Sequence, residues 1–198
     1  VSDFASAGGY AIYRNDGTGV LSITATQGTG AGNGFLGASS GDIDNDGDID
    51  IVYNQFYQFG SGAGYAHILI NDGKGNFSPG QTINVGPTLY FSRLADLDND
   101  GWLDLVTEQS GSSVLKIYKN MSGIFAGPTQ TINVGNPNLG KMDTLDGNGD
   151  GYLDIAVTVG PAPGVVFVPN NAGTFGTAVT TSLLLGAGSL GVGDTDGD

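Results

Sequence analysis

The chain has 198 residues and carries six Lys and Arg against twenty Asp and Glu, which gives a formal net charge of −14. So acidic a composition lacks the basic patch needed to bind nucleic acid or an anionic membrane surface, and no apolar run approaches the roughly 18 residues of a membrane span. The chain has no cysteine, so disulfide bonds cannot stabilise it.

In chain order, apolar or alternating runs predict short β-strands separated by turns rich in glycine and asparagine. The runs occupy residues 1–6, 10–15, 20–26, 35–40, 49–55, 66–71, 81–85, 89–95, 103–109, 114–120, 129–134, 139–145, 153–159, 165–170, 177–185 and 189–193. No stretch shows helical periodicity or helix-capping residues. The sequence therefore predicts an all-β protein with very little helix.

A carboxylate-rich loop recurs along the chain, complete at residues 42–50, 96–104 and 146–154 and cut off at 194–198. The starting points are spaced by 54, 50 and 48 residues, which is the period of a propeller blade or a solenoid turn. We predict one repeat region over 1–198, a β-propeller-type array of about four four-stranded blades, either a partial or small propeller or a segment of a longer array. Its repeats are 1–41 without a loop, 42–95, 96–145 and 146–193, followed by a truncated start at 194–198.

Turns rich in Asn, Asp and Gly recur between the second and third runs of each repeat, at residues 15–17, 71–73, 120–123 and 170–173. These residue types accept positive φ, so the segments are predicted to be hairpin turns without a binding role.

The acidic loops have the residue pattern of a calcium site. Ca2+ takes six to eight oxygen ligands, which carboxylates at alternate positions of a tight loop can supply. Carboxylates or an amide stand at positions 1, 3, 5 and 9, and position 7 is expected to offer its backbone carbonyl. The predicted ligands are Asp42, Asp44, Asp46, Asp48 and Asp50; Asp96, Asp98, Asp100, Trp102 and Asp104; Asp146, Asn148, Asp150, Tyr152 and Asp154; and, in the truncated loop, Asp194, Asp196 and Asp198.

Other metal sites fit the loops less well. An EF-hand needs a Glu at position 12 and a following helix, whereas these loops continue into β-rich runs. The loops hold no sulfur or imidazole donor for zinc or copper, and magnesium would keep more of its water. Solvated Asx turns without a metal are the alternative interpretation.

The loops, the preceding segment 35–41 (FLGASSG) and the Asn-Asp-Gly-x-Gly hairpin at 71–75 resemble the FG-GAP repeat, also called the VCBS or integrin-α-like repeat. The resemblance covers almost the whole chain. It implies a β-propeller with one four-stranded blade per repeat, calcium in an interstrand loop, and a role outside the cell in adhesion, carbohydrate recognition or surface scaffolding. Integrin-like propellers have about seven blades, so this resemblance leaves three arrangements open: further blades beyond the ends, a closed ring of four, or an open array.

Catalysis would need a convergent set of acid, base or nucleophile. The chain has one histidine, His67, in an alternating run typical of a sheet, and one glutamate, Glu108, which we expect on the surface after a strand. We predict no catalytic residue and no enzyme, with a part in a polysaccharide-degrading enzyme as a remaining alternative.

The primary functional prediction is an extracellular, calcium-stabilised surface scaffold or adhesion protein, because weak extracellular calcium sites would stay empty in a resting cytosol. The fourth loop stops at its fifth position, so we expect either a longer array or a neighbouring subunit, joined head to tail, that completes it. A carbohydrate-binding propeller is the alternative. Rings that could stack on a glycan or a protein ligand lie in or beside the connection 55–65: Tyr53, Phe56, Tyr57 and Phe59.

Overall fold

The structure is a computed structural model, and it describes residues 9–28, 33–57, 62–87, 89–109, 111–160, 164–183 and 190–193. Each regular element in these ranges is a β-strand, and no helix occurs among them. Within those ranges there is accordingly no helix with the length and hydropathy of a membrane span. The predicted all-β fold is confirmed.

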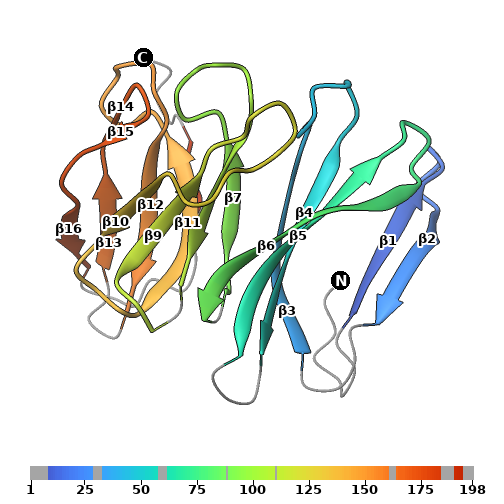
Figure 1. Ribbon diagram of the computed structural model, residues 1–198, viewed down its shortest axis with the longest axis horizontal. Coiled ribbons are helices and arrows are strands. Elements are labelled where there is room, and N and C mark those ends of the chain that lie inside the picture. The colour runs from blue at the N-terminus through green and yellow to red at the C-terminus, as the bar shows by residue number, and fades with distance from the viewer. Residues whose placement is uncertain are drawn as a thin grey trace. The chain divides into compact units, whose positions relative to one another are not determined.

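The strands form a two-stranded N-terminal hairpin and three four-stranded sheets (Figure 1). The N-terminal hairpin pairs β1 (Gly9–Asn15) with β2 (Leu21–Gly28). The first sheet has the order β3 (Asn33–Gly41), β4 (Asp50–Tyr57), β5 (Ala63–Asn71), β6 (Phe77–Pro87). The second sheet has the order β10 (Gln130–Asn133), β9 (Val114–Tyr118), β8 (Asp104–Glu108), β7 (Ser92–Ala95). The third sheet has the order β11 (Leu139–Leu145), β12 (Asp154–Val159), β13 (Gly164–Val168), β16 (Val179–Ser182), and the short hairpin of β14 (Asn170–Asn171) and β15 (Thr174–Phe175) precedes β16 in the chain.

Each four-stranded sheet keeps its strands in chain order, which is the arrangement of a propeller blade. The prediction of four-stranded units is therefore confirmed. The sheets are offset from the loop-to-loop repeats, because the strand before an acidic loop pairs with the strand after it. Counted by sheets, the units span residues 33–87, 92–133 and 139–182. The predicted strand at 1–6 lies outside the described residues.

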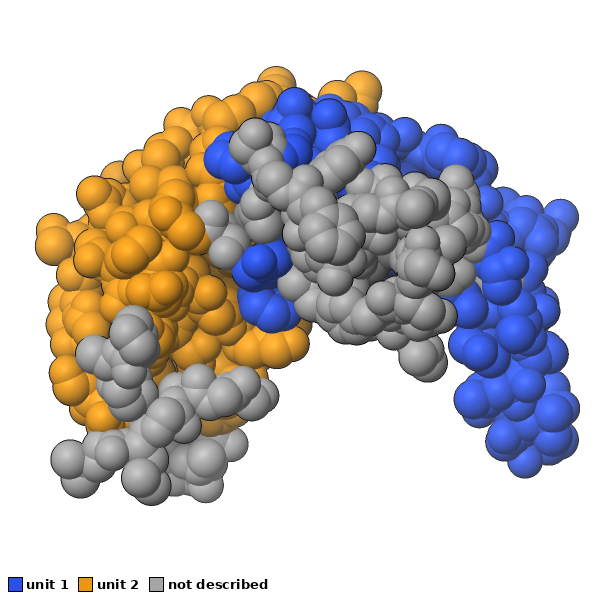
Figure 2. Space-filling model, turned by 90° about the horizontal axis from the view of Figure 1, so that it is seen from below, with its two compact units in different colours: residues 1–92 blue, residues 93–198 orange. Residues whose placement is uncertain are grey.

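The chain divides into two compact units, residues 1–92 and 93–198, which are coloured separately in Figure 2. In the second unit the second and third sheets share one apolar core. Its buried members are Ala95, Leu97, Val106, Leu115, Ile117, Ile132, Val134, Leu139, Ile155, Val157, Val159, Val166 and Val168. In the first unit, fully buried side chains include Ile43, Val52, Ala66, Val85 and Leu89. Alternating burial along β5 and β13 follows from the two-residue period of a strand.

The expectation that Glu108 lies on the surface is wrong. All five residues of β8 are buried, and Glu108 itself has no exposed surface. The physical reason is the place of β8 in its sheet: it has a strand on each side, and both of its faces are covered. Sequence periodicity could not show this, because a charged residue at the end of a strand such as β8 is ordinarily expected on the surface.

The predicted hairpin turns are confirmed. Positive φ angles occur at Gly17 (89°) and Gly73 (73°) in the first two turns. In the later turns a non-glycine residue also takes this conformation, Ser122 at 58° and Ala172 at 51°. The third turn closes through a bridge between Asn120 and Phe125 in place of a continuous strand pair.

Candidate metal centres

The three complete acidic loops occupy the same topological place. The first acidic loop (42–50) joins β3 to β4, the second (96–104) joins β7 to β8, and the third (146–154) joins β11 to β12. In each sheet this is the connection between the first two strands in the chain. Positions 1 to 9 are counted below from the first aspartate of each loop.

The carboxylate at position 1 organises the turn of each loop. Asp42 accepts hydrogen bonds from the N–H groups of Asp46 at 3.1 Å and Gly47 at 3.0 Å. Asp96 and Asp146 accept the equivalent bonds from positions 5 and 6 of their own loops. The chain can curl around this carboxylate because positions 4 and 6 have positive φ: 58° and 96° in the first loop, 58° and 87° in the second, 77° and 88° in the third. Only Asn and Gly stand there, and these residue types tolerate that conformation best.

The carboxylate at position 9 is buried and ties its loop to the hairpin turn of the same sheet. Asp154 has no exposed surface, and its two oxygens accept hydrogen bonds from the N–H groups of Asn170 at 2.7 Å and Gly147 at 2.9 Å. The equivalent bonds run to Asp50 from Asn71 and Ile43, and to Asp104 from Asn120. Position 9 is thus a structural hydrogen-bond acceptor, a role that the sequence analysis did not foresee.

The carboxylate at position 3 has an oxygen that the described residues leave without a hydrogen bond. This holds for Oδ1 of Asp44 and Oδ1 of Asp98, and both atoms are buried. In these two loops the carboxylate at position 3 lies near two other carboxylates, and one oxygen from each lies within 4.8 Å of the others. The groups are Asp42, Asp44 and Asp50 in the first loop, and Asp96, Asp98 and Asp100 in the second. A buried oxygen without a partner is costly. An all-carboxylate donor set around such an atom fits a hard cation such as Ca2+.

The pKa values of two of these carboxylates are raised in the first two loops. Burial raises the pKa of Asp44, and repulsion from Asp46, Asp50 and Asp42 raises it further. Burial also raises the pKa of Asp104 to about 6; the N–H of Asn120 and the charge of Lys119 oppose this rise, and the charges of Asp98 and Asp100 add to it. The surroundings of Asp44 and Asp104 therefore disfavour the charged form of these two carboxylates.

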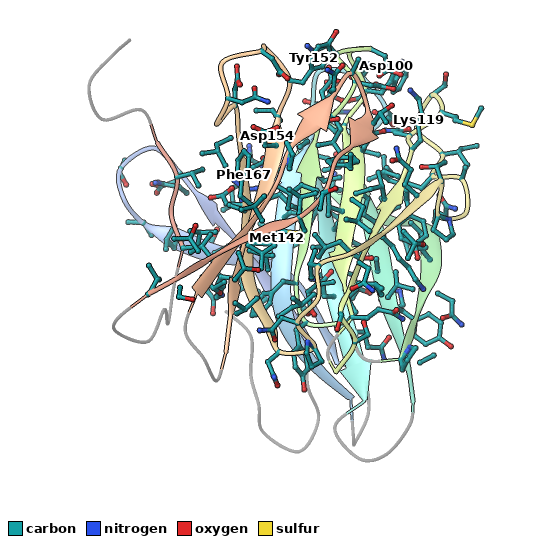
Figure 3. All side chains as sticks on the ribbon, turned by 90° about the vertical axis from the view of Figure 1, so that its left-hand side faces the viewer. Asp100, Lys119, Met142, Tyr152, Asp154 and Phe167 are labelled. Atoms are coloured by element: carbon teal, nitrogen blue, oxygen red, sulfur yellow. The ribbon has the colours of Figure 1, made fainter. Side chains whose placement is uncertain are left out.

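The second loop contains a cation that the sequence analysis missed. The Lys119 ammonium group, from the end of β9, forms ion pairs with Oδ2 of Asp98 and, at 3.1 Å, with Oδ2 of Asp100. These hydrogen bonds raise the pKa of Lys119. Figure 3 shows Lys119 beside Asp100, at the end of the molecule where Tyr152 also lies. The signal was present in the sequence: aligning the hairpin asparagines puts Lys119 where the other two repeats with a complete acidic loop have Ile70 and Pro169, while the first repeat, which lacks the loop, has Arg14.

The third loop differs from the other two at position 3, where Asn148 replaces aspartate. Its amide donates to Oδ2 of Asp150 at 3.0 Å, and its Oδ1 accepts the N–H of Asp150, also at 3.0 Å. Hydrogen bonds from the loop backbone, chiefly from Gly151, lower the pKa of Asp146. The polar groups of the third loop therefore hydrogen-bond to one another more fully than those of the other two loops. No group of three carboxylates gathers in its described residues.

Position 7 supports the loop through its backbone N–H. The N–H groups of Asp48, Trp102 and Tyr152 each donate to the carboxylate at position 5, at 2.9 Å in all three loops. That their carbonyl groups bind a metal stays a prediction. The truncated fourth loop, with Asp194, Asp196 and Asp198, lies outside the described residues.

Neighbouring loops touch within the second unit. The side-chain amide of Asn99, at position 4 of the second loop, donates to the carbonyl oxygen of Gly151 in the third loop at 2.9 Å. A Cβ atom on Gly173, in the third hairpin turn, would lie 2.8 Å from Cβ of Asp98. The second loop is therefore held by the sheet that follows it as well as by its own.

The other residues singled out from the sequence lie in the first sheet. His67 sits in β5, half-buried, with ring nitrogens 2.6 Å from Oε1 of Gln55 and 3.0 Å from Oγ1 of Thr82. Its ring stacks on Tyr53 with centroids 4.8 Å apart. Tyr53 is thus engaged with the sheet. The side chains of Phe56 and Tyr57, and all of Phe59, lie outside what the structure describes.

Comparison with known protein families agrees with this geometry. The family model described as "FG-GAP-like repeat" matches the chain three times, over residues 3–53, 57–107 and 96–157. The second and third matches each contain the second acidic loop, and together the three matches reach from the N-terminal hairpin to β12. A search of curated proteins finds no match.

Proposed function

The chain belongs to the FG-GAP-like repeat family, and on that premise we propose that its acidic loops bind Ca2+ and that the protein acts outside the cell as a calcium-stabilised scaffold or adhesion module. The fold is that of a propeller-type repeat protein. The proposal adds the metal, the location and the role.

The observation that carries the calcium proposal is the pair of buried, unpartnered oxygens at position 3, on Asp44 and Asp98. Each lies in a group of three carboxylates whose backbone is already curled by local hydrogen bonds. When bound, Ca2+ would supply the positive charge and the oxygen coordination that these groups lack. In the first loop, Asp42, Asp44 and Asp50 would hold it. In the second loop, Asp96, Asp98 and Asp100 would do so.

The kind of site supports the proposal of an extracellular scaffold role. Loops that lie between the first two strands of a sheet hold those strands together, and in the second unit the second loop also touches the next sheet. Bound calcium would therefore stabilise the repeats and their packing. Extracellular calcium is high enough to fill weak sites of this kind. Neighbouring repeats or further subunits are the partners we propose.

A non-catalytic role is supported by the surroundings of the two residues best suited to acid–base chemistry. His67 is bonded to Gln55 and Thr82 within the sheet, and burial lowers its pKa. Glu108 is buried at the end of β8, an inner strand of the second sheet. These surroundings support a structural role for both residues.

The test of calcium binding is thermal unfolding of the full chain with millimolar Ca2+, with millimolar Mg2+ and with EDTA. A ligand at 100 times its dissociation constant stabilises by about 2.7 kcal/mol per site, so Ca2+ should raise the melting temperature by several degrees over EDTA. The double variant Asp44→Asn and Asp98→Asn should lose most of that rise.

The matched control is Asp72→Asn. Asp72 lies in a hairpin turn outside the acidic loops, so removing one negative charge there should leave the calcium-dependent rise intact. Identical melting curves in Ca2+ and EDTA, with no calcium bound in a direct titration, would contradict the proposal.

Carbohydrate binding is the second candidate function, and one observation favours it. A pocket of about 370 Å³ lies between the third acidic loop and the β14–β15 hairpin. It joins an apolar ring to polar side chains, the combination that small-molecule pockets use. Its lining includes Asn148, Asp150, Asn170, Thr174 and Phe175.

A glycan array probed with and without EDTA tests this second candidate. Binding that Phe175→Ala removes and Tyr13→Ala keeps would place the sugar in this pocket, because Tyr13 is an exposed ring on the N-terminal hairpin. Absence of binding to every glycan, with the fold intact, would leave the scaffold role as the better account.

A further inference from the structure

The three hairpin turns place one residue of each sheet in the same position relative to its acidic loop. In each sheet the N–H of the first hairpin asparagine donates to the buried aspartate at position 9. The residue just before that asparagine is therefore equivalent in the three sheets. It is Ile70 in the first sheet, Lys119 in the second and Pro169 in the third. Only the second loop thus receives a charged side chain from this position.

The ammonium group of Lys119 contacts two of the three carboxylates that form the candidate metal group of the second loop. It pairs with Asp98 at position 3 and with Asp100 at position 5. The Lys119 side chain is 37% exposed, against 22% for Asp98, so the pair lies at the rim of the loop and the ammonium can withdraw into solvent. The first loop has no such group: no ion pair reaches its carboxylates from the described residues.

An ammonium group and a divalent cation compete for carboxylates that they share. Lys119 pairs with Oδ2 of Asp98 and Oδ2 of Asp100, two of the three carboxylates that would hold Ca2+, and like charges a few ångström apart repel strongly where water is partly excluded. Lys119 would therefore oppose binding of Ca2+ in the second loop, and its displacement would favour binding. The lysine side chain meanwhile neutralises part of the charge that makes an empty loop unfavourable.

We propose that Lys119 is a tethered cation of the second acidic loop, which keeps that loop folded when calcium is scarce and makes it the weaker calcium site. The inference rests on the proposed calcium function and adds an order of filling: the first loop binds Ca2+ at lower concentrations than the second. Displacement of Lys119 then marks the step at which the second loop fills.

Trp102 gives the test a probe in the second loop. It is the only tryptophan of the chain and stands at position 7 of the second acidic loop. Terbium ions bind oxygen-rich calcium sites and luminesce when a nearby excited indole transfers energy to them. Luminescence excited through tryptophan therefore reports the second loop and the third loop that touches it, and Lys119→Met changes only the second; isothermal titration with Ca2+ reports all the loops of the full chain.

The test compares wild type with Lys119→Met, which keeps the unbranched side chain, one atom shorter, and removes its charge. We expect the variant to bind terbium and calcium in the second loop about tenfold more tightly or better, and to melt at a lower temperature in EDTA. The matched control is Lys116→Met in β9, the strand that directly precedes Lys119; it changes the net charge equally and should leave both affinities as in wild type. The reciprocal variant Ile70→Lys, in which Lys119 is untouched, should weaken calcium binding in the first loop.

The outcomes separate this inference from the proposed function. Equal affinities in wild type, Lys119→Met and Ile70→Lys, with calcium bound in all three, would overturn the inference and leave the calcium function standing. No binding of calcium or terbium by any of them would overturn both. If Lys119→Met fails to fold, Ile70→Lys decides the question, because its expected loss of affinity at the first loop does not need the other variant.

Discussion

The side-chain amide nitrogen of Asn170 lies 2.6 Å from the carbonyl oxygen of Leu97, so the hairpin turn of the third sheet holds the backbone of the second acidic loop. Asn170 is buried, and the same amide also donates to the carbonyl oxygen of Leu153 at 3.0 Å. The side chain of the equivalent asparagine in the first sheet, Asn71, donates to Ile49 at 3.2 Å and accepts the N–H of Gly75 at 3.1 Å, both within its own repeat. Asn170 therefore couples two successive repeats of the second unit.

Removing this amide should destabilise the second unit. Asn170→Ala leaves the buried carbonyl group of Leu97 and the partly buried one of Leu153 without this donor, and an unsatisfied buried group costs about 1–3 kcal/mol. The control Asn71→Ala removes an exposed bond to Ile49 and a partly buried bond from Gly75, and it should cost less than Asn170→Ala because neither bond is fully buried. Urea unfolding in EDTA measures both. Equal losses in the two variants would show that the contact with Leu97 contributes nothing.

The close approach of the third hairpin turn to the second loop makes a second prediction. Gly173 has φ 80°, and an added Cβ would lie 2.8 Å from Cβ of Asp98. Gly173→Ala should therefore cost about 1–2 kcal/mol for the backbone and a further 1–3 kcal/mol for the overlap. Gly135→Ala is the control, because Gly135 also has positive φ, 74°, but faces open space. If thermal unfolding shows the same loss for both, the two elements are not in contact in solution.

The buried aspartate at position 9 should matter even without metal. Asp154→Ala removes the acceptor of two backbone N–H groups, those of Gly147 and Asn170, and hydrogen bonds to a charged group are worth about 1.5–3 kcal/mol each. We expect a loss of about 3–5 kcal/mol in EDTA. Asp154→Asn keeps one acceptor oxygen and should lose about half as much. An unchanged free energy of unfolding in Asp154→Ala would contradict the structural role of Asp154, since metal ligation cannot contribute when calcium is chelated.

The sheet around His67 predicts a dependence of stability on pH. Burial lowers the pKa of His67 below its ordinary value of 6.5, so the unfolded chain takes up a proton at higher pH than the folded chain. His67 should thus cost no stability above about pH 7 and an increasing amount as the pH falls through 6.5. His67→Gln removes this contribution. The difference in unfolding free energy between wild type and variant, followed from about pH 8 to pH 5, should change in the variant's favour as the pH falls; a constant difference would refute the prediction.

Much of the architecture could be predicted from the sequence because it depends on local patterns. Alternating apolar runs of five to nine residues predicted most of the strands, and Asn, Asp and Gly at the turns predicted the hairpins with positive φ. The pattern failed where packing overrides periodicity. Glu108 ends a strand with both faces covered, and no local signal distinguishes it from a surface glutamate.

In the acidic loops, too, the local structure could be predicted from the sequence and the long-range contacts could not. Their internal bonds, from Asp42 to Asp46 and Gly47 for example, join residues four or five apart, so the repeated sequence is enough to fold each loop the same way. The unlike behaviour of the loops comes from residues further along the chain. Lys119 reaches Asp98 from 21 positions away, and no feature within the loop itself predicts it.

By itself, the sequence determined an all-β chain of repeated sheets, the repeat family and the backbone of each acidic loop, because hydrogen bonds between near neighbours and the two-residue period of a strand set these features. Only the tertiary structure decided which loop receives a lysine, which carboxylates are buried as acceptors and which turn holds the next repeat. Those outcomes depend on side chains brought together from distant positions, such as Asn170 and Leu97, which lie 73 residues apart. Contacts of that range follow from how the sheets pack.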